Sequence, residues 1–210
     1  MLIIVQARLN SKRFPGKVLT KINGIPLLKY LINNLKKSNN KIKIVIATSK
    51  KKTDDPLVKF CTRNKIKFFR GDLNNVASRL LSCAKKFKAN YFMRVCGDSP
   101  LIRYQIVDRA IRIHKETNQS YDLITNLFPR TFESGQSIEI IRTTSLSKNL
   151  VFFSKEQKEH VTKFFYDNHK KFMIKNFKNY RKNTKMLKMS VDQKSDLEAI
   201  IKNEYFKYAE

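Results

Sequence analysis

The sequence predicts an α/β fold with a mostly parallel sheet flanked by helices, in a chain of 210 residues. Two observations lead to this prediction. Short apolar runs of strand length recur through the first hundred residues, and amphipathic stretches with helical spacing lie between them. Such alternation implies right-handed crossovers and parallel strands. In open parallel sheets ligands bind outside the carboxyl ends of the strands, so we expect the functional site there.

The first half of the chain is expected to contain four buried strands and three helices. The strands are the apolar runs 2–5, 42–47, 66–69 and 91–95. The helices are the amphipathic stretches 27–35, 56–64 and 76–87. Asp54, Asp55 and Pro56 indicate a helix start, because acidic residues suit the N-terminal dipole and proline suits an early helical position.

After residue 120 the alternation is less regular. Strands are expected at 121–126 and 137–141, the second antiparallel, and further strands at 172–177 and 186–191. A helix is expected at 156–169, and a closing helix at 195–208 begins with Ser195 and Glu198 spaced as a capping box. No repeat or linker interrupts the pattern, so residues 1–210 are expected to form a single domain.

The composition leaves the partner open. The net charge of +27 first suggests binding to nucleic acid or an anionic membrane. The alternative is compositional drift in an A- and T-rich genome, since the basic residues occur throughout, asparagine and isoleucine are abundant, and tryptophan is absent. The sequence has no helix-turn-helix, paired Cys-x-x-Cys or RNP-like pattern, so a nucleic-acid partner is not expected.

The apolar runs and the cysteines indicate where in the cell the protein is expected. No run approaches the roughly 18 apolar residues of a membrane span, so no membrane partner is expected. The short apolar start has no basic region ahead of it, which argues against a secretory signal. The three cysteines have no zinc-like spacing and are interpreted as reduced core residues. We therefore expect a cytoplasmic protein.

A basic loop follows the first strand. It contains Arg8, Ser11, Arg13 and Lys17, together with Gly16, which allows a close backbone approach. Cations and hydroxyls after a buried strand are typical of a polyphosphate site. The glycine spacing of a Walker A loop is missing. The alternative is a solvated basic loop, since one residue in five is Lys or Arg, and Lys12 is assigned to that background.

Two aspartates follow predicted strands. Asp98 comes after 91–95 and a glycine, and Asp192 comes directly after 186–191. Carboxylates from two strand ends could share one Mg²⁺ ion and bridge it to a triphosphate. Each aspartate could instead cap a helix or form a turn. Arg79 lies in an apolar helical face, where it either reaches the nucleotide or extends to solvent.

These residues together resemble a known family. The order Gln6-Ala7-Arg8-x-x-Ser11-x-Arg13-x-Pro15-Gly16-Lys17, then Ala47-Thr48-Ser49, Arg70-Gly71-Asp72, Arg94 to Pro100 and Val191-Asp192 resembles the sugar cytidylyltransferases. The likeness is to those of spore-coat polysaccharide biosynthesis, which are related to acylneuraminate and KDO cytidylyltransferases. It implies a Rossmann-like, GT-A-type nucleotidyltransferase fold, with residues 1–120 binding nucleotide. Residues 121–190 would bind the sugar and could form a homodimer.

The resemblance also implies the roles of individual residues. Triphosphate binding is implied for Ala7, Arg8, Ser11 and Lys17, with Arg13 as a further donor. The implied cytidine pocket consists of Thr48, Ser49, Gly71 and Arg79. The implied Mg²⁺ ligands are Asp98 and Asp192, and the implied sugar-facing residues are Asn126, Glu139, Glu159 and His160. Catalysis would rest on Arg8, Lys17 and Asp98. His160 is alternatively a polar helix residue without a role in binding.

The implied reaction is transfer of CMP from CTP to a sugar, with release of pyrophosphate. An acidic sugar such as a nonulosonate, used for surface glycan synthesis, is expected. Two alternatives remain at this stage: a GT-A glycosyltransferase that consumes a nucleotide sugar, and a basic nucleic-acid-binding protein. Gly135-Gln136-Ser137 stands where relatives often carry Gly-Leu-Asp, which leaves the identity of the sugar open.

Overall fold

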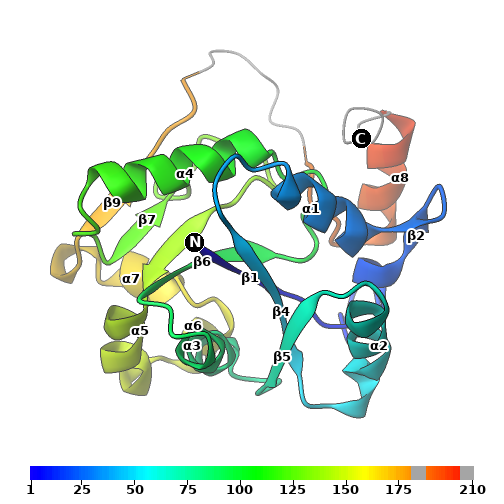
Figure 1. Ribbon diagram of the computed structural model, residues 1–210, viewed down its shortest axis with the longest axis horizontal. Helices are drawn as coiled ribbons and strands as arrows, with labels where there is room; N and C mark the ends of the chain where they lie inside the picture. The colour runs from blue at the N-terminus through cyan, green and yellow to red at the C-terminus, as the bar shows by residue number, and fades with distance from the viewer. Residues whose placement is uncertain (181–187, 204–210) are drawn as a thin grey trace.

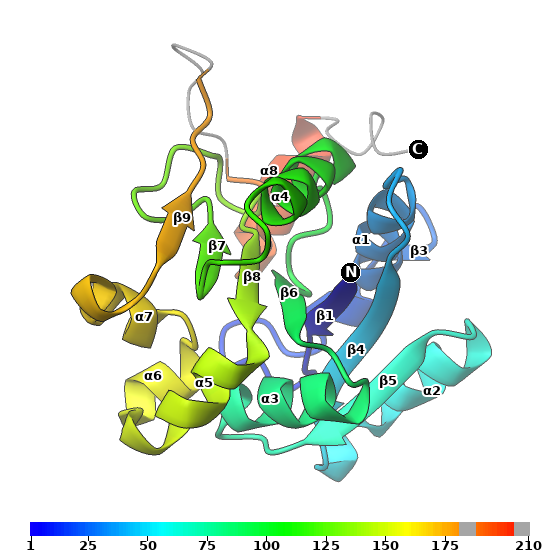
Figure 2. The same ribbon diagram turned by 60° about the vertical axis from the view of Figure 1, so that its left-hand side comes forward.

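The computed structural model describes residues 1–180 and 188–203, and a seven-stranded sheet forms its centre. Figure 2 shows the strand order β5-β4-β1-β6-β8-β7-β9. The strands are β1 (Leu2–Gln6), β4 (Lys43–Ser49), β5 (Lys67–Gly71), β6 (Tyr91–Cys96), β7 (Leu123–Thr125), β8 (Glu139–Arg142) and β9 (Ile174–Asn176). Strands β1, β4, β5 and β6 are parallel, and β8 is antiparallel to both β6 and β7. A separate hairpin pairs β2 (Lys21–Ile22) with β3 (Ile25–Pro26).

Helices cover both faces of the sheet. They are α1 (Leu27–Lys36), α2 (Asp55–Arg63), α3 (Val76–Lys86), α4 (Tyr104–Glu116), α5 (Thr143–Asn149), α6 (Lys155–Glu159), α7 (Lys163–Asp167) and α8 (Lys194–Lys202). Figure 1 shows α1 and α4 on one side of the sheet and α3 and α5 on the other. Successive strand side chains point to opposite faces, so Ile3 and Val5 pack with α1 and α4, whereas Ile4 packs with α3. A central strand buried on both faces is typical of a parallel sheet.

The sequence predictions for the first half are confirmed, because every strand and helix expected there is present within a few residues of its expected bounds. Helix α4 was not predicted. The spacing of its buried residues is helical, so the helix could have been predicted from the sequence. These residues are Ile106, Val107, Ala110, Ile111 and His114. The expected antiparallel strand at 137–141 is present as β8.

Two predicted elements of the second half are wrong, whereas the expected closing helix is present. The single helix expected at 156–169 is two short helices, because the backbone leaves the helical region at His160. No strand forms at 188–191, where Lys188 makes an isolated bridge to Ser134; residues 186 and 187 lie outside the described residues. The closing helix starts at Lys194, and the last residues expected in it, 204–208, are likewise not described.

The predicted cap of the closing helix is also wrong. Gln193 occupies the N-cap position, and the carboxylate of Asp196 accepts hydrogen bonds from the backbone N–H groups of Asp192 and Gln193, at 2.8 and 3.0 Å. The capping group therefore lies one residue beyond Ser195, and it fixes the backbone that carries Asp192. No helix among residues 1–180 and 188–203 is long and apolar enough to cross a membrane.

The carboxyl ends of the parallel strands meet at one edge of the sheet. The basic loop leaves β1 at this edge, and Gly97 and Asp98 leave β6 beside it. The segment that carries Asp192 arrives from the other end of the chain, where the N–H of Val191 donates to the carbonyl of Asp98 at 2.8 Å. The fold therefore brings both predicted metal-binding aspartates to the edge where ligands bind.

Gly135 is required where the loop before β8 meets the segment that carries Asp192. Its φ is +90°, and a Cβ atom there would lie 2.6 Å from the carbonyl carbon of Met189. Gly24 has a similar φ of +79°, but a Cβ atom would meet nothing within 4 Å.

We expect Gly24→Ala to lower the free energy of unfolding by about 1–2 kcal/mol, the cost of a left-handed backbone. Gly135→Ala should lower the free energy of unfolding by about 1–3 kcal/mol more than Gly24→Ala does, because the new methyl group must displace a packed backbone. Urea denaturation of the two variants measures this difference. Equal losses would contradict the contact between the two segments.

Candidate active site

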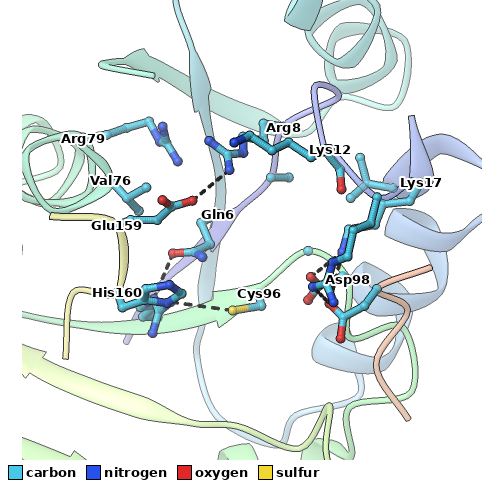
Figure 3. Close-up of a pocket in the computed structure, with 17 residues that line it drawn as sticks. Gln6, Arg8, Lys12, Lys17, Val76, Arg79, Cys96, Asp98, Glu159 and His160 are labelled. Carbon is cyan, nitrogen blue, oxygen red and sulfur yellow. Dashed lines mark hydrogen bonds and ion pairs between the residues drawn. The ribbon is translucent and has the colours of Figure 1, made fainter. Parts of the chain in front are cut away.

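A cavity of about 540 Å³ opens at the carboxyl edge of the sheet. Its charged lining consists of six cations (Arg8, Lys12, Arg13, Lys17, Arg79 and Arg94) and three carboxylates (Asp98, Glu159 and Asp192). Figure 3 shows Lys17 and Asp98 at one end of the cavity and Arg79, Arg8 and Glu159 at the other. The excess of positive charge suits a polyanionic ligand, since the carboxylates neutralise only half of the cations.

The basic loop has a defined shape because it is held at two points. The N–H of Gly16, whose φ is +74°, donates to the carbonyl of Leu9 at 2.8 Å and closes the loop. The N–H of Leu9 donates to Asp54 at 2.7 Å. Asp54 is fully buried, and it also accepts hydrogen bonds from the backbone N–H and the hydroxyl of Ser49. The loop is therefore a built part of the site rather than a solvated surface segment.

Lys17 joins the two predicted metal ligands. Its side chain is nearly buried, and Nζ donates to Asp98 Oδ2 and to the carbonyl of Val191, both at 2.7 Å. Asp192 Oδ1 lies 3.6 Å from the same nitrogen. Arg13 and Lys188 also pair with Asp192, at 3.3 Å each. Two carboxylates thus converge on one positively charged group.

The donor set at this point fits a hard divalent cation. The ammonium group of Lys17 shows that Asp98 and Asp192 can share one positive charge. Among the described residues no group of three or more His, Cys, Asp or Glu side chains could hold a metal ion. Two carboxylates without further protein ligands suit Mg²⁺, which keeps several waters and takes the rest of its ligands from substrate phosphates.

Arg79 reaches the other end of the cavity from α3. Its side chain is 2% exposed, and its guanidinium donates to the carbonyl oxygens of Asp72 and Leu73. Its Nε atom is buried and has no hydrogen-bond partner. Burial, followed by the positive charge of Arg8, lowers the pKa of Arg79 to about 10. A buried donor without a partner at a cavity wall is suited to an acceptor on a ligand.

The other residues expected around the cytidine do not line this cavity. Thr48 and Ser49 are fully buried at the end of β4, and Gly71 is buried at the end of β5. A Cβ atom at residue 71 would lie 2.7 Å from Cγ of Arg79, so glycine there makes room for the arginine. The hydroxyl of Ser49 is bonded to Asp54, whereas that of Thr48 has no partner. Gly71 therefore lies against the side chain of Arg79, and Ser49 is its neighbour on the adjacent strand.

The expected sugar-facing residues fall into two groups. Glu159 and His160 line the cavity, whereas Asn126 and Glu139 are buried and do not. The amide of Asn126 donates to the carbonyl of Gln136 and accepts from the N–H of Ile138, which fixes the loop before β8.

Glu139 is the centre of a buried polar network. Its carboxylate is paired with Arg94 across β6 and β8, and it also accepts hydrogen bonds from the hydroxyls of Thr162 and Tyr166. Thr162 lies two residues after His160, so this network holds the turn that presents Glu159 and His160. Burial lowers the pKa of Arg94, but the Glu139 carboxylate outweighs this effect and raises it. Arg94 is therefore charged throughout the physiological range.

Among the cavity residues with a polar or sulfur-containing side chain, four were not assigned a role from the sequence. They are Gln6, Lys12, Arg94 and Cys96. Gln6 accepts a hydrogen bond from Nε of Arg94 at 2.8 Å, and the two form part of the cavity wall. The signal for Arg94 was an arginine inside the buried run of β6, since a charge inside an apolar strand needs a partner. Lys12, which was assigned to the background, is exposed and also lines the cavity, a position that depends on the shape of the loop.

A mostly parallel sheet with a basic, carboxylate-containing cavity at its carboxyl edge is typical of nucleotide-binding α/β enzymes. The family model for cytidylyltransferases matches residues 2–209, so the chain belongs to that family and is a nucleotidyltransferase. This confirms the family resemblance and the nucleotidyltransferase fold predicted from the sequence. It also supports CTP as the nucleotide, and it favours nucleotidyl transfer over the glycosyltransferase alternative.

Individual relatives agree with this assignment. The spore coat polysaccharide biosynthesis protein SpsF of Bacillus subtilis is 29% identical over 210 residues, covering 95% of this chain and 84% of the relative. The structure of a cytidylyltransferase from Leptospira borgpetersenii matches with a TM-score of 0.83 and 25% identity, covering 96% of this chain and 94% of the other. The 3-deoxy-manno-octulosonate cytidylyltransferase of Bdellovibrio bacteriovorus is 25% identical over 142 residues, covering 66% of this chain and 55% of the relative.

We expect Glu139→Ala to lower the free energy of unfolding by about 3–5 kcal/mol, because it leaves the buried charge of Arg94 without a partner. Glu159→Ala removes a partly exposed partner of Arg8 and should lower the free energy of unfolding by no more than about 1 kcal/mol. Chemical denaturation of both variants provides the measurement. Similar losses in the two variants would show that the Glu139 network is not needed for stability.

We expect Cys96 to react slowly with iodoacetamide at pH 8 and much faster as the pH approaches 11. Burial raises the pKa of this thiol to about 11, and the thiolate is the nucleophile. Cys61 and Cys83 are buried, so labelling followed by mass spectrometry can isolate Cys96. A rate that has already levelled off by pH 9 would contradict the raised pKa.

Proposed function

We propose that this protein transfers CMP from CTP to a hydroxyl group of an acidic sugar and releases pyrophosphate, in the synthesis of a surface polysaccharide. The observation that carries the proposal is the convergence of Lys17, Asp98 and Asp192 at one end of a cation-lined cavity. Membership of the cytidylyltransferase family supports CTP as the donor.

The triphosphate is assigned to the basic loop. Arg8 and Lys17 supply charge to the phosphates, Ser11 and Arg13 supply further donors, and Ala7 lines the same wall. The cavity volume of about 540 Å³ lies within the range of small-molecule sites. Cations placed at the phosphates act where negative charge grows during the reaction.

The cytidine is assigned to the end of the cavity formed by Arg79. The unpartnered Nε of this buried arginine supports the assignment, because a pyrimidine carries carbonyl and ring-nitrogen acceptors. Gly71 leaves the space in which the side chain of Arg79 lies, and the buried residues Thr48 and Ser49 pair with the end of β5 that carries Gly71.

Asp98 and Asp192 are assigned to Mg²⁺ because both line the cavity and both pair with the ammonium group of Lys17. When bound, the ion neutralises charge on the triphosphate and on the pyrophosphate leaving group. In the nucleotide-free protein the Lys17 ammonium keeps these carboxylates from repelling each other.

The sugar is assigned to the wall formed by Glu159, His160, Gln6 and Arg94. An acidic sugar is supported by the excess of cations over carboxylates in the cavity lining, and by one relative that is named for an octulosonate, which carries a carboxylate. Glu139 and Asn126 act behind this wall, where they fix Arg94 and the neighbouring loop. The association with polysaccharide synthesis rests on the similarity to SpsF.

The chemistry is a single in-line displacement. The sugar hydroxyl gives its proton to solvent water as its oxygen forms a bond to the α-phosphorus, and the bond from that phosphorus to the bridging oxygen breaks, so that the electron pair leaves on the pyrophosphate. Arg8 and Lys17 stabilise the charge on the leaving group, and the walls of the cavity hold the two substrates in line. No covalent enzyme intermediate is required.

The two parts of the chain divide this work. Residues 1–120 supply the nucleotide side together with Asp192, whereas the sugar wall combines Gln6 and Arg94 with Glu159 and His160 from the second part, residues 121–190. The second part also has exposed apolar side chains, with Val151 at 77% and Phe152 at 70% exposure. We propose that this surface contributes to a homodimer, which size measurement in solution can test.

We expect CTP with Mg²⁺ to raise the melting temperature of the protein more than UTP or ATP, since a ligand of the folded state stabilises it by mass action. With CTP and a panel of acidic sugars, the protein should release pyrophosphate. Asp98→Asn should reduce the rate by about 10²-fold or more, whereas Glu116→Gln, an exposed carboxylate on α4, serves as the control and should not.

Pyrophosphate release separates this function from that of a glycosyltransferase, which consumes a nucleotide sugar. The proposal fails if no nucleotide stabilises the protein and no acidic sugar supports pyrophosphate release. It also fails if Asp98→Asn behaves like the Glu116 control in both measurements.

A further inference from the structure

One ion pair spans the mouth of the cavity. Arg8 comes from the basic loop after β1, and Glu159 is the last residue of α6 (Figure 3). Nη2 of Arg8 lies 2.9 Å from Oε1 of Glu159, and the two side chains are 33% and 52% exposed. Both residues line the cavity, so the pair joins its nucleotide wall to its sugar wall.

Glu159 acts as the counter-charge of more than one arginine. It is bonded directly to Arg8, and its negative charge also opposes the lowering of the pKa of Arg79 by burial and by Arg8. These are two of the guanidinium groups that the proposed function assigns to CTP. A triphosphate near them would meet a carboxylate that already occupies one of its partners.

The side chain of Glu159 can turn away from Arg8 without disturbing the core, because its side-chain partner is Arg8 and it is 52% exposed. Helix α6 has five residues, none of them buried, and it begins at a capping box formed by Ser154 and Gln157. The anchor of this segment lies after Glu159, where Val161 is fully buried and Thr162 is bonded to Glu139. Displacement of the Glu159 side chain therefore exposes little apolar surface, and few contacts oppose it.

We propose that Glu159 holds Arg8 in the nucleotide-free enzyme, and that the triphosphate of CTP displaces it and frees its carboxylate for the sugar. The inference rests on the proposed function. Two anionic groups beside one guanidinium repel each other, and the triphosphate carries the greater charge. The released carboxylate stays next to His160, on the wall assigned to the sugar, where it can accept hydrogen bonds from sugar hydroxyls.

Glu159 then has opposite effects on the two substrates. It competes with CTP for Arg8, so its loss strengthens CTP binding. It contacts the sugar after release, so its loss weakens sugar binding. A residue with a merely structural role would weaken both, and a distant charge would change neither selectively.

Calorimetric titration with CTP and Mg²⁺, without sugar, tests the first effect. Glu159→Gln should lower the Kd for CTP by about 1.5- to 5-fold, the range expected on release of a partly exposed ion pair. Glu156→Gln is the matched control, because it removes the same charge from the same helix at a residue that does not line the cavity. Its Kd should stay close to that of the natural protein.

A double-mutant cycle tests whether the effect acts through Arg8. Arg8→Gln should raise the Kd for CTP, and adding Glu159→Gln to that variant should give less than half of the gain seen in the natural background. In steady-state kinetics at saturating CTP, Glu159→Gln should raise the KM for the sugar by at least 3-fold, whereas Glu156→Gln should leave it unchanged.

The outcomes separate the two proposals. If the natural protein does not bind CTP, both the proposed function and this inference fail. If it binds CTP, but Glu159→Gln binds it equally or more weakly, or no better than Glu156→Gln does, the displacement inference alone is overturned. An equal gain with and without Arg8 also overturns it, because the carboxylate would then act only through its general charge.

Discussion

The candidate site depends on one nearly buried ammonium group. Nζ of Lys17 bonds to Asp98 from one strand end and to the carbonyl of Val191 from the distant C-terminal segment, and it lies near Asp192. Without this cation, two carboxylates would face each other in a partly buried place. The same charge distribution can accept a divalent ion and a triphosphate. The interaction that holds Asp98 and Asp192 together therefore also defines what the site can bind.

A second feature of the cavity is the pairing of two of its cations with carboxylates, the contacts that we propose a nucleotide competes for. Lys17 is paired with Asp98, and Arg8 is paired with Glu159. The pairs differ in what supports them. Asp98 directly follows a central strand, whereas Glu159 ends a short helix with no buried residue. The rigid pair suits metal and phosphate binding, and the exposed pair suits a group that moves between two substrates.

Much of the fold could be predicted from the sequence, because β1, β4 and β6 are largely buried and stand out as apolar runs, and β5 at the sheet edge is still a short apolar run. The two aspartates were predicted to meet, but the strand expected before Asp192 does not form; a hydrogen bond from the N–H of Val191 to the carbonyl of Asp98 brings this segment to the sheet edge instead. The residues of the buried network could not be predicted. Glu139 is paired with Arg94 through the register of an antiparallel strand pair, and Thr162 reaches it through a turn that helical spacing did not reveal. These contacts depend on tertiary packing between segments distant in the chain.

The central claim is that Asp98 and Asp192 together hold the metal ion that accompanies CTP. A crystal of the complex with CTP and Mn²⁺, measured at the manganese absorption edge, tests it most directly. The account predicts one anomalous peak between the two carboxylates, beside the triphosphate, with Lys17 no longer occupying that position. A manganese peak elsewhere, or a bound triphosphate with Lys17 still between Asp98 and Asp192, would contradict it.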